Sequence, residues 1–350
     1  MLDRPDPDRP AVHQHRSRGR RDLGAQPLAR LRSAARRRRP PPAHREHSGL
    51  RAPGRDLPLK RLGTIVALPV VALAGAVTVG LLAGSILVAP ANHPVGLPPS
   101  DLAGRSIEFR TETGDLLRGW FVQGDRDKGG IVLVHGIRSD RRSMIDRARF
   151  LRAAGYSVLL FDLQAHGESP GQHITFGYQE SAGVEAAVRF LRDHDSRNRV
   201  GVIGCSLGGA ACLLGPRPVD ADAVILEAVY PDIGHATAHR LHPVLGPVGD
   251  WLAPLLTLQV KGRLGIPVGE LSPIEKIGHL RAPVLVIGGA EDHRTTPEET
   301  RALFAAAPCS KELWLVPGAA HVDLCRYAGA DYRRRVLEFF NKHLDGQRAG

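Results

Sequence analysis

The pentad G-C-S-L-G at residues 204–208 places a serine between two glycines at the spacing of a nucleophile turn. The β-branched run before it, Val200–Ile203, predicts a strand, and the small-residue segment Gly209–Leu214 predicts a helix. A turn this sharp, with no Cβ atom at either glycine, would project the hydroxyl of Ser206 above the edge of a sheet. There it can attack an acyl carbonyl, so Ser206 is the predicted nucleophile.

An acid and a base that activate this serine are expected later in the chain, the acid at the end of the strand Val284–Ile287 and the base after Leu313–Val316, the last parallel strand. His321 ends a loop of small residues, so its imidazole can reach back toward Ser206 and take the hydroxyl proton. Asp292 stands three residues beyond Gly289, past the end of a strand, where its carboxylate would fix the tautomer of the imidazole. The chain has 16 histidines in all, and the rival acids are Glu227, Glu291 and Asp323.

Two backbone N–H groups are predicted to stabilise the oxyanion that forms when an acyl carbonyl is attacked. Leu207 follows the nucleophile at the start of the predicted helix, where N–H groups have no partner within the helix. Ile137 follows the predicted strand Ile131–Val134 across His135 and Gly136. A metal is the other use for His135, but no cluster of Cys, Asp or Glu at metal spacing accompanies it. No metal and no other cofactor is predicted.

The strands that must carry these residues are visible as short apolar runs between residues 131 and 316, with helical stretches between them. Continuous β-branched runs suit strands buried on both faces, as in a parallel sheet. Their alternation with helices implies βαβ units and a doubly wound α/β fold. Two earlier strands, Ser106–Arg110 and Leu117–Gln123, bring the mostly parallel sheet to eight. The six runs are Ile131–Val134, Ser157–Phe161, Val200–Ile203, Ala223–Leu226, Val284–Ile287 and Leu313–Val316.

An insertion interrupts this alternation of strands and helices. It lies between the strand that ends near Glu227 and the strand that begins near Val284. The segment Leu271–Leu280 can supply the expected crossover helix, which leaves about 230–270 as extra sequence with an apolar stretch inside it. An insertion here overhangs the carboxyl ends of the strands, where open α/β sheets place their sites. We therefore expect a small cap that lines the substrate pocket; an ordinary packed pair of helices is the alternative.

The net charge of +11 lies entirely in residues 1–61, which hold 17 Lys or Arg against 6 Asp or Glu; the remainder has 30 of each. This Arg-rich and Pro-rich region has too few apolar residues to form a core, and it is predicted to be disordered. A functional basic arm and a segment that is not translated are the alternatives. The domain that follows is neutral, so nucleic acid is not an expected partner.

The region 63–89 has no charged residue and is almost continuously apolar from Ile65 to Val88, longer than the roughly 20 residues that cross a bilayer. It is predicted to be a transmembrane helix, followed by a linker at 90–100. A cleaved signal peptide is the competitor, because residues 89–91 loosely resemble a cleavage site. Basic residues are denser before the span than after it. The expected topology is single-pass, with a cytoplasmic N-terminus and an extracytoplasmic domain at 101–346.

Five segments together resemble the α/β-hydrolase family, in matching order from about residue 106 to 344. The resemblance is strongest to the bacterial branch related to serine aminopeptidases, monoacylglycerol lipases and small carboxylesterases, and it implies the chain order Ser206, Asp292, His321. It also implies that Asp162 and the turn after it are structural. The segments are V-L-V-H-G at 132–136, F-D-L-Q-A-H-G-E-S at 161–169, the pentad at 204–208, G-A-E-D at 289–292 with Pro297, and G-A-A-H at 318–321.

These observations predict a membrane-anchored serine hydrolase, resembling carboxylesterases and lipases, that cleaves a small-molecule acyl ester or thioester through an acyl-enzyme. A peptidase or an acyltransferase would use the same triad on another bond or with another acceptor. A non-catalytic binding protein on the same fold is the third hypothesis. The oligomeric state is not predicted.

Overall fold

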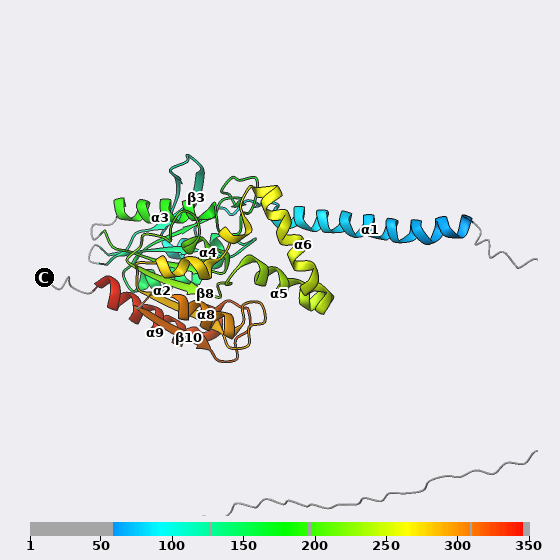
Figure 1. Ribbon diagram of the computed structural model, residues 1–350. Coiled ribbons are helices and arrows are strands. Elements are labelled where there is room, and N and C mark those ends of the chain that lie inside the picture. The colour runs from blue at the N-terminus through cyan, green and yellow to red at the C-terminus, as the bar shows by residue number, and fades with distance from the viewer. Residues whose placement is uncertain (1–58, 126–127, 195–197, 309, 346–350) are drawn as a thin grey trace, which may run out of the picture. The chain divides into compact units, whose positions relative to one another are not determined.

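A twisted sheet of eight strands forms the centre of the protein (Figure 1), in a computed structural model that describes residues 59–125, 128–194, 198–308 and 310–345. The strand order is β10-β9-β8-β7-β4-β5-β3-β2, and β3 runs antiparallel to the other seven strands, which are parallel to one another. This confirms the predicted α/β-hydrolase fold with a mostly parallel sheet of eight strands. The strands are β2 (Arg105–Arg110), β3 (Leu116–Val122), β4 (Gly130–Val134), β5 (Ser157–Phe161), β7 (Val200–Cys205), β8 (Ala223–Glu227), β9 (Val284–Gly289) and β10 (Lys311–Val316).

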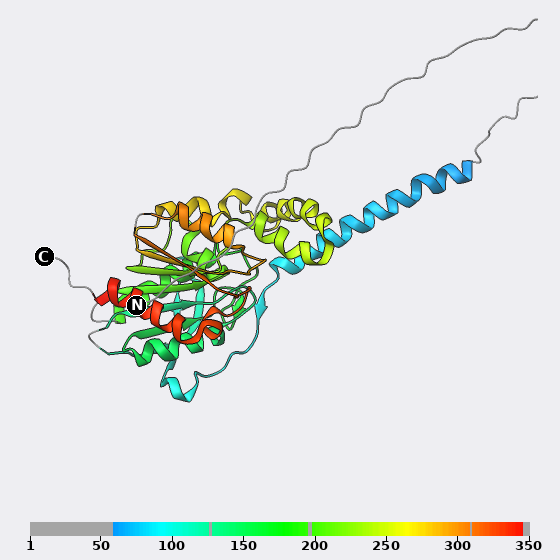
Figure 2. The same ribbon diagram turned by 90° about the horizontal axis from the view of Figure 1, so that it is seen from below.

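Helices cover both faces of this sheet, as seen when Figure 1 is compared with Figure 2. Alternate residues of β4 show why: Val132 and Val134 pack into one apolar cluster, and Ile131 and Leu133 into another. The first cluster includes residues of α3, α4 and α8, and the second includes residues of α2 and α9. The helices are α2 (Ile145–Ala153), α3 (Glu180–His194), α4 (Leu207–Leu213), α8 (Pro297–Ala306) and α9 (Leu324–Phe340).

The predicted insertion forms a helical hairpin, α5 (Ile233–Leu245) and α6 (Pro247–Leu264), between β8 and β9. The expected crossover helix at 271–280 is shorter than predicted. Only α7 (Pro273–Lys276) is α-helical, and a 3-10 turn (Ile277–His279) follows it. Gly278 weakens the helix there, and Pro283 keeps the residue before it out of the helical region, so the chain turns into β9 at once.

The stretch predicted as a linker, residues 90–100, is bound along the domain. Its strand β1 (Ala91–Asn92) pairs with β6 (His166–Gly167) in a separate two-stranded sheet. The carboxylate of Glu168 accepts hydrogen bonds from the N–H groups of Val95 (2.9 Å) and Gly96 (3.0 Å). The start of the domain is therefore fixed against the turn that follows β5.

Helix α1 (Leu59–Val88) contains the predicted transmembrane segment. Its stretch Val70–Val88 is long and apolar enough to span a bilayer, and little of that stretch is buried. The side chains from Val70 to Val79 are all exposed, and Gly84 and Val88 near the end of the helix are the first buried ones. The basic region predicted to be disordered, up to residue 58, lies outside the described residues.

Candidate active site

Ser206 occupies the turn between β7 and α4 in a strained backbone conformation, with φ 50° and ψ −110°. The two glycines of the pentad make this turn possible. A Cβ on Gly204 would lie 2.7 Å from the carbonyl oxygen of Gly208, and one on Gly208 would lie 2.5 Å from that of Val134. Either contact is closer than real Cβ atoms reach, so strand, turn and helix pack together only with glycine at both places. Strain of this kind is characteristic of functional turns.

Asp292 and His321 come together from the ends of β9 and β10. The Nδ1–H of His321 donates to Oδ2 of Asp292 at 2.7 Å, and the carboxylate also accepts the N–H groups of Arg294 (2.7 Å) and Thr295 (3.0 Å). Burial raises the pKa of Asp292, but the hydrogen bond and charge of His321, with those N–H groups, outweigh it and bring the pKa below its ordinary value. Asp292 is therefore ionised near neutral pH.

Ser206 and His321 line one hollow, which we call the polar hollow because the charged side chains of Arg147, Glu227 and Asp323 also line it. In the described part of the chain, no hydrogen bond joins the Ser206 hydroxyl to the imidazole. Such contacts are often long in enzymes without substrate and tighten when it binds.

Two of the three rival acids bind other side chains, and the third is exposed. Glu227 accepts a hydrogen bond from Arg147 at 2.6 Å and another from the hydroxyl of Tyr332, and all three side chains are buried. Asp323 forms an ion pair with Arg147 at 2.9 Å and accepts a hydrogen bond from the N–H of Cys325 at the start of α9. Glu291 is exposed. Of the four carboxylates considered, only Asp292 is hydrogen-bonded to His321.

The two predicted oxyanion donors lie beside the serine. Leu207 is the first residue of α4, and Ile137 is in the loop after β4; both line an apolar hollow that also includes Ser206. Gly136 brings this loop close, since a Cβ on it would lie 3.7 Å from the Cβ of Ser206. An oxyanion formed at Ser206 would therefore lie between two backbone segments that can donate to it.

His135 is a structural histidine in this geometry. It is fully buried, its Nε2 accepts the N–H of Leu163 at 3.0 Å, and its Nδ1 lies 2.7 Å from the carbonyl oxygen of Gly136. Because Nε2 is the acceptor, Nδ1 carries the proton and the ring is neutral. The described residues hold no group of three or more His, Cys, Asp or Glu side chains that could bind a metal ion.

Burial lowers the pKa of His135 and of its neighbour His166 from the ordinary 6.5 to about 4. Between these values the unfolded chain binds more protons than the folded one, so acid favours unfolding. The free energy of unfolding is expected to fall as the pH is lowered from about 6.5 to about 4, by on the order of 3 kcal/mol per histidine, and this contribution levels off below pH 4. Urea titrations of the full chain in detergent, over a series of pH values, measure it.

The matched variant for this test is His166→Asn, because the Nε2 atom of His166 is buried without a hydrogen-bond partner and asparagine can replace the contact of Nδ1 with the carbonyl of Gln164. This variant is expected to lose about half of the pH dependence between pH 6.5 and 4. If the free energy of unfolding of the variant depends on pH as steeply as that of the wild type, His166 does not contribute to the acid sensitivity of the fold.

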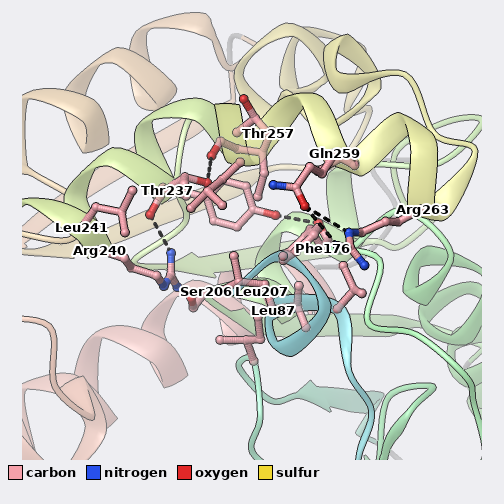
Figure 3. Close-up of a pocket in the computed structure, with 18 residues that line it drawn as sticks. Leu87, Phe176, Ser206, Leu207, Thr237, Arg240, Leu241, Thr257, Gln259 and Arg263 are labelled. Carbon is pink, nitrogen blue, oxygen red and sulfur yellow. Dashed lines mark hydrogen bonds between the residues drawn. The ribbon is translucent and has the colours of Figure 1, made fainter. Parts of the chain in front are cut away.

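Two hollows meet at Ser206. The polar one is lined by His321, and the apolar one is lined by residues of α5 and α6 (Figure 3). The end of α1 also lines the apolar hollow with Gly84, Leu87 and Val88. Sequence reasoning missed these three residues, because they lie more than a hundred positions from Ser206 and no local pattern links them to it.

The comparisons with known proteins agree with this geometry. The sequence profile of the Alpha/beta hydrolase family matches residues 131–331. The uncharacterized protein Rv2307c of Mycobacterium tuberculosis is 30% identical over 270 residues, which cover 73% of this chain and 89% of the relative. The uncharacterized protein YqkD of Bacillus subtilis is 24% identical over 65% of this chain and 76% of its own length. Among solved structures, the Pyrococcus furiosus esterase Pf2001 is similar with a TM-score of 0.61 and 25% identity, over 74% of this chain and 99% of the esterase.

Proposed function

The chain belongs to the alpha/beta hydrolase family, and on that premise we propose that it is a membrane-anchored serine hydrolase that cleaves acyl esters or thioesters. The observation that carries the proposal is the convergence of three predicted residues. Ser206 is held on a strained turn, His321 lines the same hollow, and Asp292 is hydrogen-bonded to that imidazole at 2.7 Å. They come from three loops at the carboxyl edge of one sheet, where α/β folds place their sites.

The proposed reaction has two steps. In the first, the Ser206 oxygen attacks the acyl carbonyl carbon while the Nε2 atom of His321 takes the hydroxyl proton, and the N–H groups of Leu207 and Ile137 stabilise the oxyanion. The tetrahedral intermediate expels the alcohol or thiol, which takes its proton from the imidazolium. In the second step, water attacks the acyl-enzyme, again with His321 as base, and releases the acid and free Ser206.

The two hollows support an acyl substrate with a polar leaving group. The apolar hollow beside Ser206 suits the acyl chain, and the hollow that holds His321 is bordered by Arg147 and Asp323. A leaving group has to receive its proton from His321, so it is expected on that polar side.

The chemistry is tested by treating the full chain in membranes with a fluorophosphonate and mapping the modified peptide. We expect one adduct, at Ser206, because this reagent reacts with a serine that a neighbouring base has activated. Ser206→Ala should remove the adduct, and Ser106→Ala, at an exposed position of β2, should keep it. No adduct on the folded wild type, or an adduct at another serine, would refute the proposal.

The location is part of the proposal: α1 crosses the membrane once, with a cytoplasmic N-terminus and an extracytoplasmic hydrolase domain. Arg51, Arg55, Lys60 and Arg61 precede the apolar span closely, which favours this orientation. An alkaline phosphatase fused to the C-terminus should be active in a bacterial host, whereas a green fluorescent protein fused there and exported by the general secretory route should be dark. The reverse pair of results would place the domain in the cytoplasm.

A further inference from the structure

The end of α1 is part of the wall of the apolar hollow that contains Ser206. Leu87 and Val88 from its last turn, and Gly84 one turn earlier, line the hollow together with residues of α5 and α6 (Figure 3). A helix with the length and composition of a membrane span thus ends beside the hollow that contains the candidate nucleophile Ser206. In both views the α5–α6 hairpin lies beside this end of α1 (Figures 1 and 2).

Polar side chains of α6 hold it against α1. Gln259 donates to the carbonyl oxygen of Gly80 at 3.2 Å, and Arg263 donates to that of Leu81 at 2.6 Å and to the hydroxyl of Ser85 at 2.7 Å. Gly80 and Gly84 are four residues apart, so they share one helix face, and a Cβ on Gly84 would lie 2.4 Å from Oε1 of Gln259. Small residues at this spacing, with polar side chains across from them, are typical of helix pairs within membranes.

A second contact ties α1 to the predicted oxyanion loop. Arg138, the residue after Ile137, donates to the carbonyl oxygens of Ile86 and Ala89 (3.3 Å for Ala89). These carbonyls are at the C-terminus of α1, where backbone oxygens lack helical partners and attract a cation. Hydrogen bonds from α6 and from Arg138, in the loop beside Ser206, therefore both hold the end of α1 in place.

The outer face of the hairpin is apolar and exposed. Trp251 is 83% exposed, and between Val244 and Val260 the only charged residue is Asp250, which His242 contacts at 3.0 Å. On α6 the exposed apolar residues recur every three or four positions, which places them on one helix face. The exposed apolar residues of the hairpin are Val244, Leu245, Val248, Trp251, Leu252, Leu255 and Leu258.

This apolar face lies on a hairpin that packs beside the exposed apolar residues at the end of α1. Leu81, Leu82 and Ile86, from the part of α1 that α6 contacts, are at least half exposed. At about 1.5 Å per residue, Gly80 lies roughly 12 Å from Val88 along the helix, so α6 packs on nearly the last half of the candidate span Val70–Val88. Exposed apolar patches of this kind mark interaction surfaces, and this one is beside a helix that could span a bilayer.

We propose that the α5–α6 hairpin is embedded in the membrane leaflet that surrounds the C-terminal turns of α1, and that the substrate is a membrane lipid whose acyl chain enters the Ser206 hollow from that leaflet. This inference rests on the proposed hydrolase function and anchor, and it adds the substrate class and the route of entry. Inside the hollow the acyl chain would contact mostly apolar side chains, such as Leu87, Val88 and Leu256, until its ester carbonyl reaches Ser206.

The embedding is tested on the full chain in phosphatidylcholine vesicles. The protein has three tryptophans, and Trp120 and Trp314 are only 1% and 9% exposed, so Trp251 is the one placed to meet lipid. With lipids brominated near the top of the acyl chains, we expect quenching that removes most of the Trp251 fluorescence. The matched variant Trp251→Phe should retain its remaining fluorescence in the same vesicles. Flotation and fluorophosphonate labelling of the same samples report separately on the anchor and on Ser206.

Absence of quenching in protein that floats with the vesicles and is labelled at Ser206 would overturn the embedding while leaving the proposed function intact. Chemical crosslinking of the same samples would then show whether a second copy of the chain covers the hairpin face. Absence of flotation or of labelling would instead count against the proposed function.

The route of entry is tested by narrowing the hollow from the side of α1. Leu87→Trp, at a half-buried position that lines the hollow, is expected to lower kcat/KM at least about tenfold more for a long-chain lipid ester in vesicles than for a soluble butyryl ester. The matched control is Leu82→Trp, one of the exposed residues of α1 outside the hollow, which should keep the wild-type ratio. An equal loss on both esters, or a matching change in the control, would show that lipid does not enter past α1.

Discussion

Replacing Ser206 with alanine is expected to lower kcat for ester hydrolysis by at least about 10⁴-fold. In the proposed reaction this hydroxyl supplies the oxygen that forms the acyl-enzyme, and alanine has no oxygen at this position. Alanine has the same Cβ as serine, so the backbone strain at this position does not change. The expected free energy of unfolding is therefore within about 0.5 kcal/mol of the wild-type value.

The measurement is kcat for an acyl ester with purified full chain in detergent, together with circular dichroism and a urea titration of both proteins. Ser106→Ala is the control, because Ser106 is exposed on β2 at the far edge of the sheet. Near-normal hydrolysis by Ser206→Ala would remove the nucleophile from the proposal. A loss of activity accompanied by unfolding would show a structural role for the hydroxyl instead.

Replacing Asp292 with asparagine is expected to lower kcat by about 10⁴-fold with little change in KM. The carboxylate accepts the Nδ1–H of His321, which leaves Nε2 free to take the serine proton. An amide that donates to Nδ1 would favour the opposite tautomer, whose Nε2 carries a hydrogen and cannot act as a base. The size of Asp292 is retained, so the loss should come from chemistry rather than packing.

Glu291→Gln is the matched control for this variant, because Glu291 is the adjacent carboxylate and is exposed. It should retain wild-type kcat. Because the pKa of Asp292 lies below its ordinary value, the carboxylate should stay ionised down to about pH 4, and acid inactivation above that pH must have another cause. A large loss in Glu291→Gln with none in Asp292→Asn would reverse the assignment of the acid.

The residues proposed for chemistry all come from the hydrolase domain, whereas part of the lining of the apolar hollow comes from α1. The strained turn, the imidazole and the carboxylate belong to the sheet and its loops, whereas Gly84, Leu87 and Val88 complete the apolar side of the hollow. A hydrolase domain without α1 would keep the residues proposed for chemistry but would lose this wall and the partner of Arg138. Studies of substrate preference therefore need the full chain.

Much of the fold was readable from the sequence because its signals are local. Six of the eight strands follow from short apolar runs, and the turn at Ser206 follows from glycines two residues on either side of the serine. The helix with the composition of a membrane span follows from hydropathy alone. Each of these features depends on sterics or burial within a few adjacent residues, so each leaves a pattern that a single sequence displays. The exceptions were short elements, such as β1 and the broken crossover at 273–279.

The choice of the acid and the walls of the apolar hollow could be found only in the tertiary structure, because they depend on contacts between residues far apart in the chain. Four carboxylates lay at suitable places in the sequence, and packing left Asp292 hydrogen-bonded to His321 while Arg147 engaged Glu227 and Asp323. The roles of these three remain proposals that the variants above test. The meeting of α1, the α5–α6 hairpin and Ser206 in one hollow likewise has no local signal. It arises because α1 packs against segments that lie more than a hundred residues further along the chain, and such packing is set by the shapes of whole elements rather than by their neighbours in the chain.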